Sequence, residues 1–160
     1  MFLDEMEQEA QTTRKMLKLV PDDKFNWQPH PRSMTMLALA THIAEMPAWT
    51  GMVLNTDGID FSTMDFTPTP IHNTADLLML LNKSLADGKA ALEAATETQL
   101  TGIWAMRDGD FIISTSLRHG AIRIGYSQTV HHRAQLGVYL RLLNIPIPGS
   151  YGPSADDKSF

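Results

Sequence analysis

The segment YSQTVHHRAQLGVYL, residues 126–140, belongs to the last long amphipathic stretch of the chain. Steps of three and four residues give one stripe along it, which consists of Leu117, Ala121, Gly125, Gln128, His132, Gln135 and Tyr139. Such spacing is typical of one face of a helix. The ends of the stripe are apolar or small, as packing requires, but its middle is polar. We therefore predict a packed helix of about residues 116–143 that carries a polar site at its centre.

Apolar residues at helical spacing predict three further helices, at about residues 2–19, 34–54 and 74–95. Four long amphipathic helices joined by crossover connections are typical of a four-helix bundle. Sites in such bundles are commonly built from side chains on facing helices. We therefore predict an all-α fold, a four-helix bundle, with residues 1–160 forming a single domain.

Capping residues and one proline refine the expected helices. Ser33 is the expected N-cap of the second helix, and Asn73 or Thr74 that of the third. Pro47 lies inside the second helix, one turn beyond His42. Because proline clashes with the carbonyl group four residues earlier, we expect a kink at this point.

The connections differ in character. Residues 55–73, NTDGIDFSTMDFTPTPIHN, are polar and rich in Gly and Pro, and we expect a long crossover loop without strand or helix. Residues 102–116, GIWAMRDGDFIISTS, contain two short apolar runs around Asp108-Gly109. This pattern predicts a small β-hairpin inserted between the third and fourth helices. The proline-rich tail, IPIPGSYGPSADD at residues 145–157, is expected to be non-helical.

Composition excludes several classes of protein. The net charge is −5 and no run of Lys or Arg occurs, so nucleic acid is not an expected partner. The chain has no cysteine, which excludes disulfides, thiolate metal ligands and a cysteine nucleophile of its own. No apolar run approaches the roughly 20 residues that span a bilayer, and the acidic N-terminus does not resemble a signal peptide. We expect a soluble, cytoplasmic protein without a membrane partner.

Residue spacing suggests a metal site. Gln128 and His132 are one turn apart, so they can present an amide oxygen and an imidazole nitrogen to one point. An antiparallel second helix would add His42, giving three ligands with open positions for water, and imidazole suits zinc or nickel. His131 lies 100° round the helix from His132, and position on the stripe favours His132. The alternative is that these histidines are buried and bonded to carbonyl or carboxylate groups, without a metal.

Two segments resemble the signature regions of the DinB-like (DinB/YfiT) family: FNWQPHPRSMTMLALATHIAEMPAW, residues 25–49, and HHRAQLGVYLRLLNIPIPGSYGPSADD, residues 131–157. The resemblance implies a bundle that is often dimeric and holds nickel or zinc through three histidines. One comes from the second helix and two, at i and i+4, from the fourth. His42 matches the first and His132 the last. Gln128 occupies the remaining ligand position, and there the sequence departs from the family pattern.

The resemblance also implies two kinds of activity on a small-molecule substrate. One is metal-dependent hydrolysis and the other is transfer that depends on a low-molecular-weight thiol, with a metal-bound water or thiol as the nucleophile. Enzyme activity stays open, because Gln128 can complete the site or mark its decay. The alternative is a non-catalytic binding or dimerisation module with a degenerate metal site. A homodimer is expected from the resemblance.

Five other polar residues are candidates for a functional role, and three of them also have a structural interpretation. Glu45, one turn after His42, can accept a proton or lie solvated on the helix surface. Arg118 and Arg123 can meet an anionic substrate or face solvent. Arg133 and Tyr139 can donate hydrogen bonds to the residues of the metal site.

Overall fold

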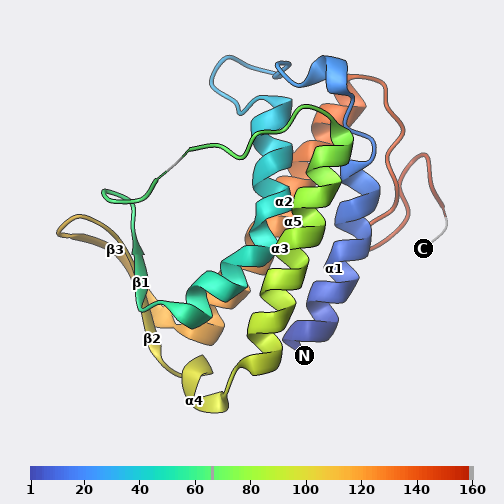
Figure 1. Cartoon of the computed structure of the whole chain (residues 1–160). Helices are drawn as coiled ribbons and strands as arrows, with labels where there is room; N and C mark the ends of the chain where they lie inside the picture. The colour runs from blue at the N-terminus through green and yellow to red at the C-terminus, as the bar shows by residue number, and fades with distance from the viewer. Residues whose placement is uncertain (66, 159–160) are drawn as a thin grey trace.

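The computed structural model describes residues 1–65 and 67–158, and four long helices form most of it (Figure 1). They are α1 (Phe2–Leu17), α2 (Met36–Asn55), α3 (Thr74–Ala94) and α5 (Arg118–Leu142). α2 packs against α3 and α5, and α1 packs against the same two neighbours. The four predicted helices are therefore present and packed side by side. The structure also contains a short helix α4 (Glu97–Leu100) and a 3-10 turn at Asp22–Lys24, neither of which we predicted.

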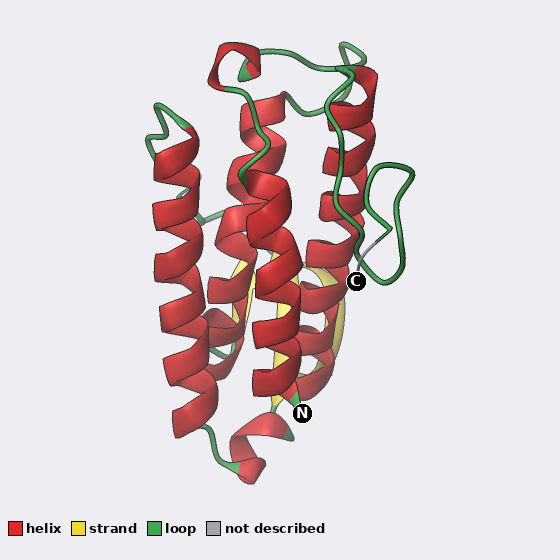
Figure 2. Cartoon of the chain, turned by 90° about the vertical axis from the view of Figure 1, so that its right-hand side faces the viewer, coloured by secondary structure: helices red, strands yellow, loops and turns green. Residues whose placement is uncertain are grey.

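A three-stranded sheet lies beside the helices (Figure 2). Its strands are β1 (Gly58–Asp60), β2 (Ile103–Asp108) and β3 (Phe111–Leu117), with β1 parallel and β3 antiparallel to β2. The predicted hairpin is confirmed: Asp108 pairs with Phe111, and Gly109 in the turn has a φ of 58°. A positive φ at this position favours glycine.

The expectation that residues 55–73 contain no strand is wrong, because Gly58–Asp60 pairs with β2. Two interactions explain the pairing. Ile59 is buried in a hydrophobic cluster with Trp104 and Ile122, and the carboxylate of Asp60 accepts hydrogen bonds from the backbone N–H groups of Ser62 and Gly109. The burial of Ile59 and the hydrogen bond from Gly109 join segments that are far apart in the sequence, so the local pattern did not reveal them.

Helix boundaries follow the capping side chains. The N-cap of α2 is Thr35, whose hydroxyl accepts from the N–H of Ala38 at 3.2 Å, so the prediction of Ser33 is wrong by two residues. Asn73 caps α3, as predicted, by accepting from the N–H of Asp76 at 3.0 Å. α5 follows directly from β3, so the strand itself determines where this helix begins.

The buried core has two parts. The upper part lies between the four long helices and the lower part lies under the sheet, where Trp104 and Ile122 are almost completely buried. Pro47 lies inside α2, and Figure 1 shows that the two ends of α2 run in different directions. At this bend α3 approaches so closely that a Cβ atom at Gly88 would lie 2.3 Å from the carbonyl oxygen of Pro47. No helix among the described residues is both long and apolar enough to cross a bilayer.

The substitution Gly88→Ala tests this close approach. Alanine favours helix formation, but its methyl group would overlap the Pro47 carbonyl group, which cannot move without displacing α2. We expect a loss of about 1–3 kcal/mol in the free energy of unfolding, measured by urea denaturation. Gly51→Ala is the control, because its added Cβ would meet only ordinary contacts, the nearest being Ala91 Cβ at 3.6 Å. Equal stability of both variants would show that α2 and α3 are not this close.

Candidate functional site

The packing of α2 against α5 determines which side chains meet at the candidate site. The indole ring of Trp49 lies over Gly125, where a Cβ atom would be 2.6 Å from Trp49 Cδ1. Trp49 Nε1 also donates to the carbonyl oxygen of Ala121 at 3.0 Å. The two helices are antiparallel, so seven residues back along α2 and seven forward along α5 bring His42 and His132 together. The Trp49–Gly125 contact thus fixes which residues meet two turns away.

His42 and His132 are in ring contact, with centroids 4.6 Å apart and planes at 80°. Both side chains are half-buried. A metal–imidazole bond is about 2.1 Å long, so two rings that bind one ion at about the tetrahedral angle must have centroids within about 5.5 Å of each other. The observed separation meets this condition.

The environment of His42 favours its neutral form. Burial lowers the pKa of the His42 imidazole below its ordinary value of 6.5, and the neighbouring His132 lowers it further, while Glu45 acts in the opposite direction. A histidine binds a metal through an unprotonated nitrogen. The structure therefore keeps His42 in the state that a metal ligand needs.

His132 has a hydrogen-bond partner that sequence reasoning missed. Its Nδ1 lies 3.0 Å from Oε1 of Gln135, one turn further along α5. An amide oxygen only accepts, so in the neutral imidazole this contact favours the tautomer with its proton on Nδ1 and its lone pair on Nε2. Gln135 belongs to the polar stripe noted in the sequence, and the i, i+3 spacing was the signal for this contact.

Gln128 and His131, which precede His132 on α5, are more exposed to solvent than His132 is. Gln128 lies one turn before His132 on α5 and is exposed. His131 is also exposed, and its ring centroid is 4.9 Å from that of His132. Of the two adjacent histidines, His132 is thus the one in ring contact with His42, whereas His131 lies on the flank.

Among the described residues, no group of three His, Cys, Asp or Glu side chains is placed to hold a metal. A third ligand from this stripe would have to be the amide of Gln128.

Glu45 lies closer to the site than a solvated surface residue would. Its side chain is half-buried, and Oε1 accepts a hydrogen bond of 2.8 Å from the hydroxyl of Thr69. Glu45 and His42 both line a cleft of about 590 Å³ between α2 and the crossover segment. A small molecule in this cleft would therefore contact His42 directly.

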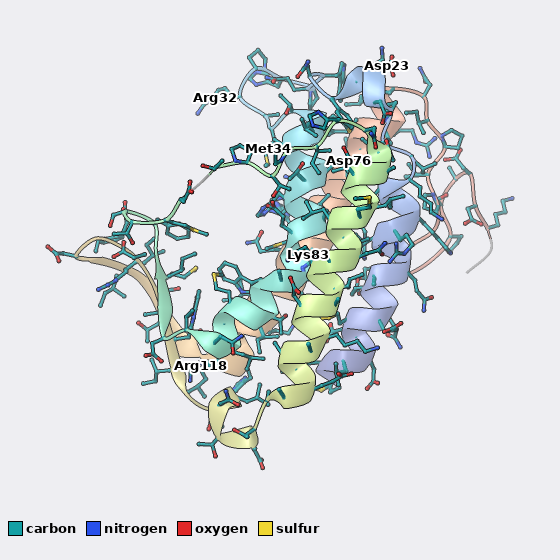
Figure 3. All side chains as sticks on the ribbon, in the orientation of Figure 1. Asp23, Arg32, Met34, Asp76, Lys83 and Arg118 are labelled. Atoms are coloured by element: carbon teal, nitrogen blue, oxygen red, sulfur yellow. The ribbon has the colours of Figure 1, made fainter. Side chains whose placement is uncertain are left out.

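The arginines that we considered are used in structural contacts. Arg133 is buried, and its Nη2 lies 2.6 Å from Oε2 of Glu9 on α1, so it does not reach the histidine pair. Arg118, labelled in Figure 3 at the junction of α5 and the sheet, forms an ion pair with Asp57. Arg123 pairs with Glu5 on α1. Their positive charges are thus neutralised within the chain.

Tyr139 also bonds away from the histidines. Its hydroxyl donates to the carbonyl oxygen of Met34 at 3.1 Å, and its ring packs against Trp27. These contacts hold the segment before α2 against α5. The expectation that Arg133 and Tyr139 support the metal site is therefore wrong, because each side chain points to a different neighbour.

Comparison with known proteins identifies the family. The model of the DinB family matches residues 1–158, and the chain belongs to this family. It is similar to an uncharacterized protein, YrdA, from Bacillus subtilis (strain 168), with 22% identity over 156 residues that cover 98% of this chain and 89% of that protein.

Solved structures show the same fold. A DinB-like protein (YjoA) from Bacillus subtilis matches 93% of this chain and 96% of its own, with a TM-score of 0.71 and 18% identity. YfiT from Bacillus subtilis matches 91% of this chain and 87% of its own, with a TM-score of 0.63 and 15% identity. YfiT is described as a probable metal-dependent hydrolase with an unusual four-helix bundle topology.

The pKa of His42 provides a test of the site in chelator-treated protein. Because the folded state disfavours protonated His42, its contribution to stability is present above pH 6.5 and is lost as the pH falls through the lowered pKa. We expect the imidazole signals of His42, followed by NMR, to titrate below pH 6.5. His132→Gln should move this pKa upward, because it removes a neighbouring positive charge, whereas the exposed His119→Gln should not. An unchanged His42 pKa in His132→Gln would contradict the ring contact.

Proposed function

We propose that this DinB-family chain binds one divalent metal ion, nickel or zinc, and acts as a metal-dependent hydrolase on a small molecule. The observation that carries the proposal is the meeting of two imidazoles from opposing helices, with centroids 4.6 Å apart. His42 and His132 are the proposed ligands, and the amide oxygen of Gln128 is the proposed third. The description of YfiT as a probable metal-dependent hydrolase supports this reaction class.

Each residue of the site has a distinct role in this proposal. When bound, a divalent cation supplies Lewis acidity and lowers the pKa of a water or thiol that it binds. His132 presents Nε2 because Gln135 holds the proton on Nδ1. Glu45 lies beside His42 in the cleft and is the carboxylate that accepts a proton there. The hydroxyl of Thr69 orients this carboxylate.

Thiol-dependent transfer is the second proposed activity. The chain contains no cysteine, so any thiol in the reaction must be a separate low-molecular-weight molecule. The cleft beside His42 is large enough for such a molecule, with a volume of about 590 Å³. Hydrolysis and transfer would then share the same ligands and differ in the nucleophile.

Metal content distinguishes an enzyme site from a degenerate one. We expect purified protein loaded with nickel or zinc to retain close to one ion per chain, measured by elemental analysis after desalting. His42→Ala should abolish retention, because it removes one of two imidazole donors. His30→Ala is the control, since His30 lies exposed in the loop before α2. Absence of metal from the wild-type protein would favour the non-catalytic module.

The substitution Gln128→His tests the site in the opposite direction, because it should increase the affinity for the metal. An imidazole binds zinc or nickel more strongly than an amide oxygen does, so this variant should retain the metal at lower free concentrations. Isothermal titration of chelator-treated protein measures the change. If the affinity does not change, the side chain at position 128 is not beside the metal.

We also propose that the chain forms a homodimer through the β2–β3 hairpin. Five large apolar side chains are exposed there: Ile103, Phe111, Ile112, Ile113 and Leu117. β3 is an edge strand, and residues 111–117 carry no charge. A two-fold axis places identical residues near each other, so an uncharged strand can meet its own copy without like-charge repulsion.

Sedimentation tests the dimer and its surface together. We expect the wild-type protein to be dimeric at micromolar concentration and Ile113→Lys to be monomeric, because lysine on an edge strand opposes pairing. Val138→Lys is the control, since Val138 is an exposed apolar residue on α5. A monomeric wild type would contradict the proposal, and a dimer lost only in Val138→Lys would place the interface on α5.

A further inference from the structure

A second cavity, of about 440 Å³, lies between α5 and the C-terminal segment, residues 145–158. Its lining comes from α1, α5 and this segment, which runs back along the bundle (Figure 1). None of the described residues that line it belongs to α2 or to the crossover segment, which form the cleft beside His42. The cavity is therefore separate from the histidine pair.

The side of α5 that faces this cavity carries an apolar stripe. Every fourth residue from position 130 belongs to it: Val130, Ala134, Val138 and Leu142. Residues four apart are neighbours on a helix surface, and all four line the cavity. Val138 is 58% exposed and Leu142 is 57% exposed, although the outward face of a helix is usually polar. This outer stripe is thus an apolar surface that the core of the bundle does not cover.

Polar contacts hold the C-terminal segment over the outer stripe. The hydroxyl of Tyr151 accepts a hydrogen bond from Nη2 of Arg133 at 2.9 Å and donates one to Oε1 of Glu9 at 2.6 Å. Further along the segment, Asp156 pairs with Arg141. The two arginines are eight residues apart, which is about 12 Å along α5. Between these two anchors the segment leaves a space above the apolar stripe and does not fill it.

Both positive charges at the cavity are paired within the chain. Among the described residues that line it, the charged ones are Arg133 and Arg141. Nη2 of Arg133 lies 2.6 Å from Oε2 of Glu9, and Arg141 pairs with Asp156. A charged ligand would either leave its own charge without a partner or break one of these pairs, and both outcomes cost free energy. The cavity therefore favours an uncharged ligand.

The size of the cavity favours a small molecule. A volume of about 440 Å³ is within the range of small-molecule sites. A helix of another protein is about 10 Å across, so it could lie along the outer stripe only by displacing the C-terminal segment from its anchors. Ser150 also lines the cavity and supplies a hydroxyl group that can donate or accept one hydrogen bond.

We infer that this cavity is a second ligand site, which binds one uncharged and largely apolar small molecule. The hydrocarbon part of the ligand lies against Val138, Leu142 and Ile147, and its polar group lies at Ser150. The C-terminal segment forms the roof of the site, and its two anchors set the length of the ligand. The site does not depend on the proposed metal site, because the two share no lining residue.

Three probes with the same ring and different charge test the inference: 2-naphthylmethanol, 2-naphthoate and 2-naphthylmethylamine. Each is titrated into the purified wild-type protein, and the backbone amide signals of Val138 and Ser150 are followed by NMR. The signal of Thr41 reports on the cleft beside His42. We expect 2-naphthylmethanol to bind most tightly, with a Kd of about 0.1–1 mM, and to leave the signal of Thr41 in place.

Three results of these titrations would overturn the inference. The first is a charged probe that binds as tightly as 2-naphthylmethanol or more tightly. The second is the absence of shifts at Val138 and Ser150 with every probe. The third is binding of 2-naphthylmethanol only as the dimer dissociates in sedimentation, because a second copy of the chain would then cover the outer stripe.

Two variants of the outer stripe locate the site. Ala134 is exposed, so Ala134→Phe adds a ring to the cavity without changing the core, and it should abolish binding of 2-naphthylmethanol. Val138→Asp should weaken binding by about tenfold or more, because it places an unpaired carboxylate in the cavity. Ala90→Phe, at an exposed position on α3, is the matched control and should bind as the wild type does. Wild-type affinity in both stripe variants would overturn the inference.

Discussion

The close packing of α2 on α5 is the constraint on which the site depends. Trp49 can approach α5 this closely only because Gly125 has no side chain, since a Cβ atom there would lie 2.6 Å from the indole ring. The hydrogen bond from Trp49 to Ala121 fixes the register of α2 along α5, and the contact with Gly125 fixes the distance between the two helices. In an antiparallel pair, one fixed contact determines every other facing pair along the seam. The meeting of His42 with His132 follows from this register.

The same register places two ionisable rings in contact, which disfavours a positive charge on His42. Two imidazolium groups in half-buried contact repel each other, and each also loses hydration. The lowered pKa of His42 expresses both effects. A packed helix would gain more stability from leucine at these positions. The free energy lost by burying two imidazoles here must therefore be offset by a ligand or by hydrogen bonds. Gln135 satisfies one nitrogen of His132, and Nε2 is left available for a ligand.

Much of this arrangement could be predicted from the sequence, because it depends on helical periodicity. Steps of three and four residues placed Gln128 and His132 on one stripe. The hairpin around Asp108-Gly109 was predicted from a different local signal, two short apolar runs on either side of a turn dipeptide. The pairing of β1 with β2 and the ion pair of Arg133 with Glu9 could not be predicted in this way. Both join segments that only the folded chain brings together. The two interpretations of Glu45 could not be separated for the same reason, since its partner, Thr69, lies 24 residues away in the crossover segment.

Position 128 is where this chain departs from the three-histidine pattern that its resemblance to the family implies. A third histidine would make the site strong enough to hold a metal by imidazoles alone, whereas an amide oxygen is a weaker donor to zinc or nickel. The surroundings of the histidine pair are consistent with the proposed site: the pKa of His42 is lowered, Gln135 bonds to His132, and a carboxylate lies in the adjoining cleft. A site that had lost its function would not need these supports, because apolar residues would stabilise the seam better. Their presence together supports the proposal that Gln128 modifies the site and does not abolish it.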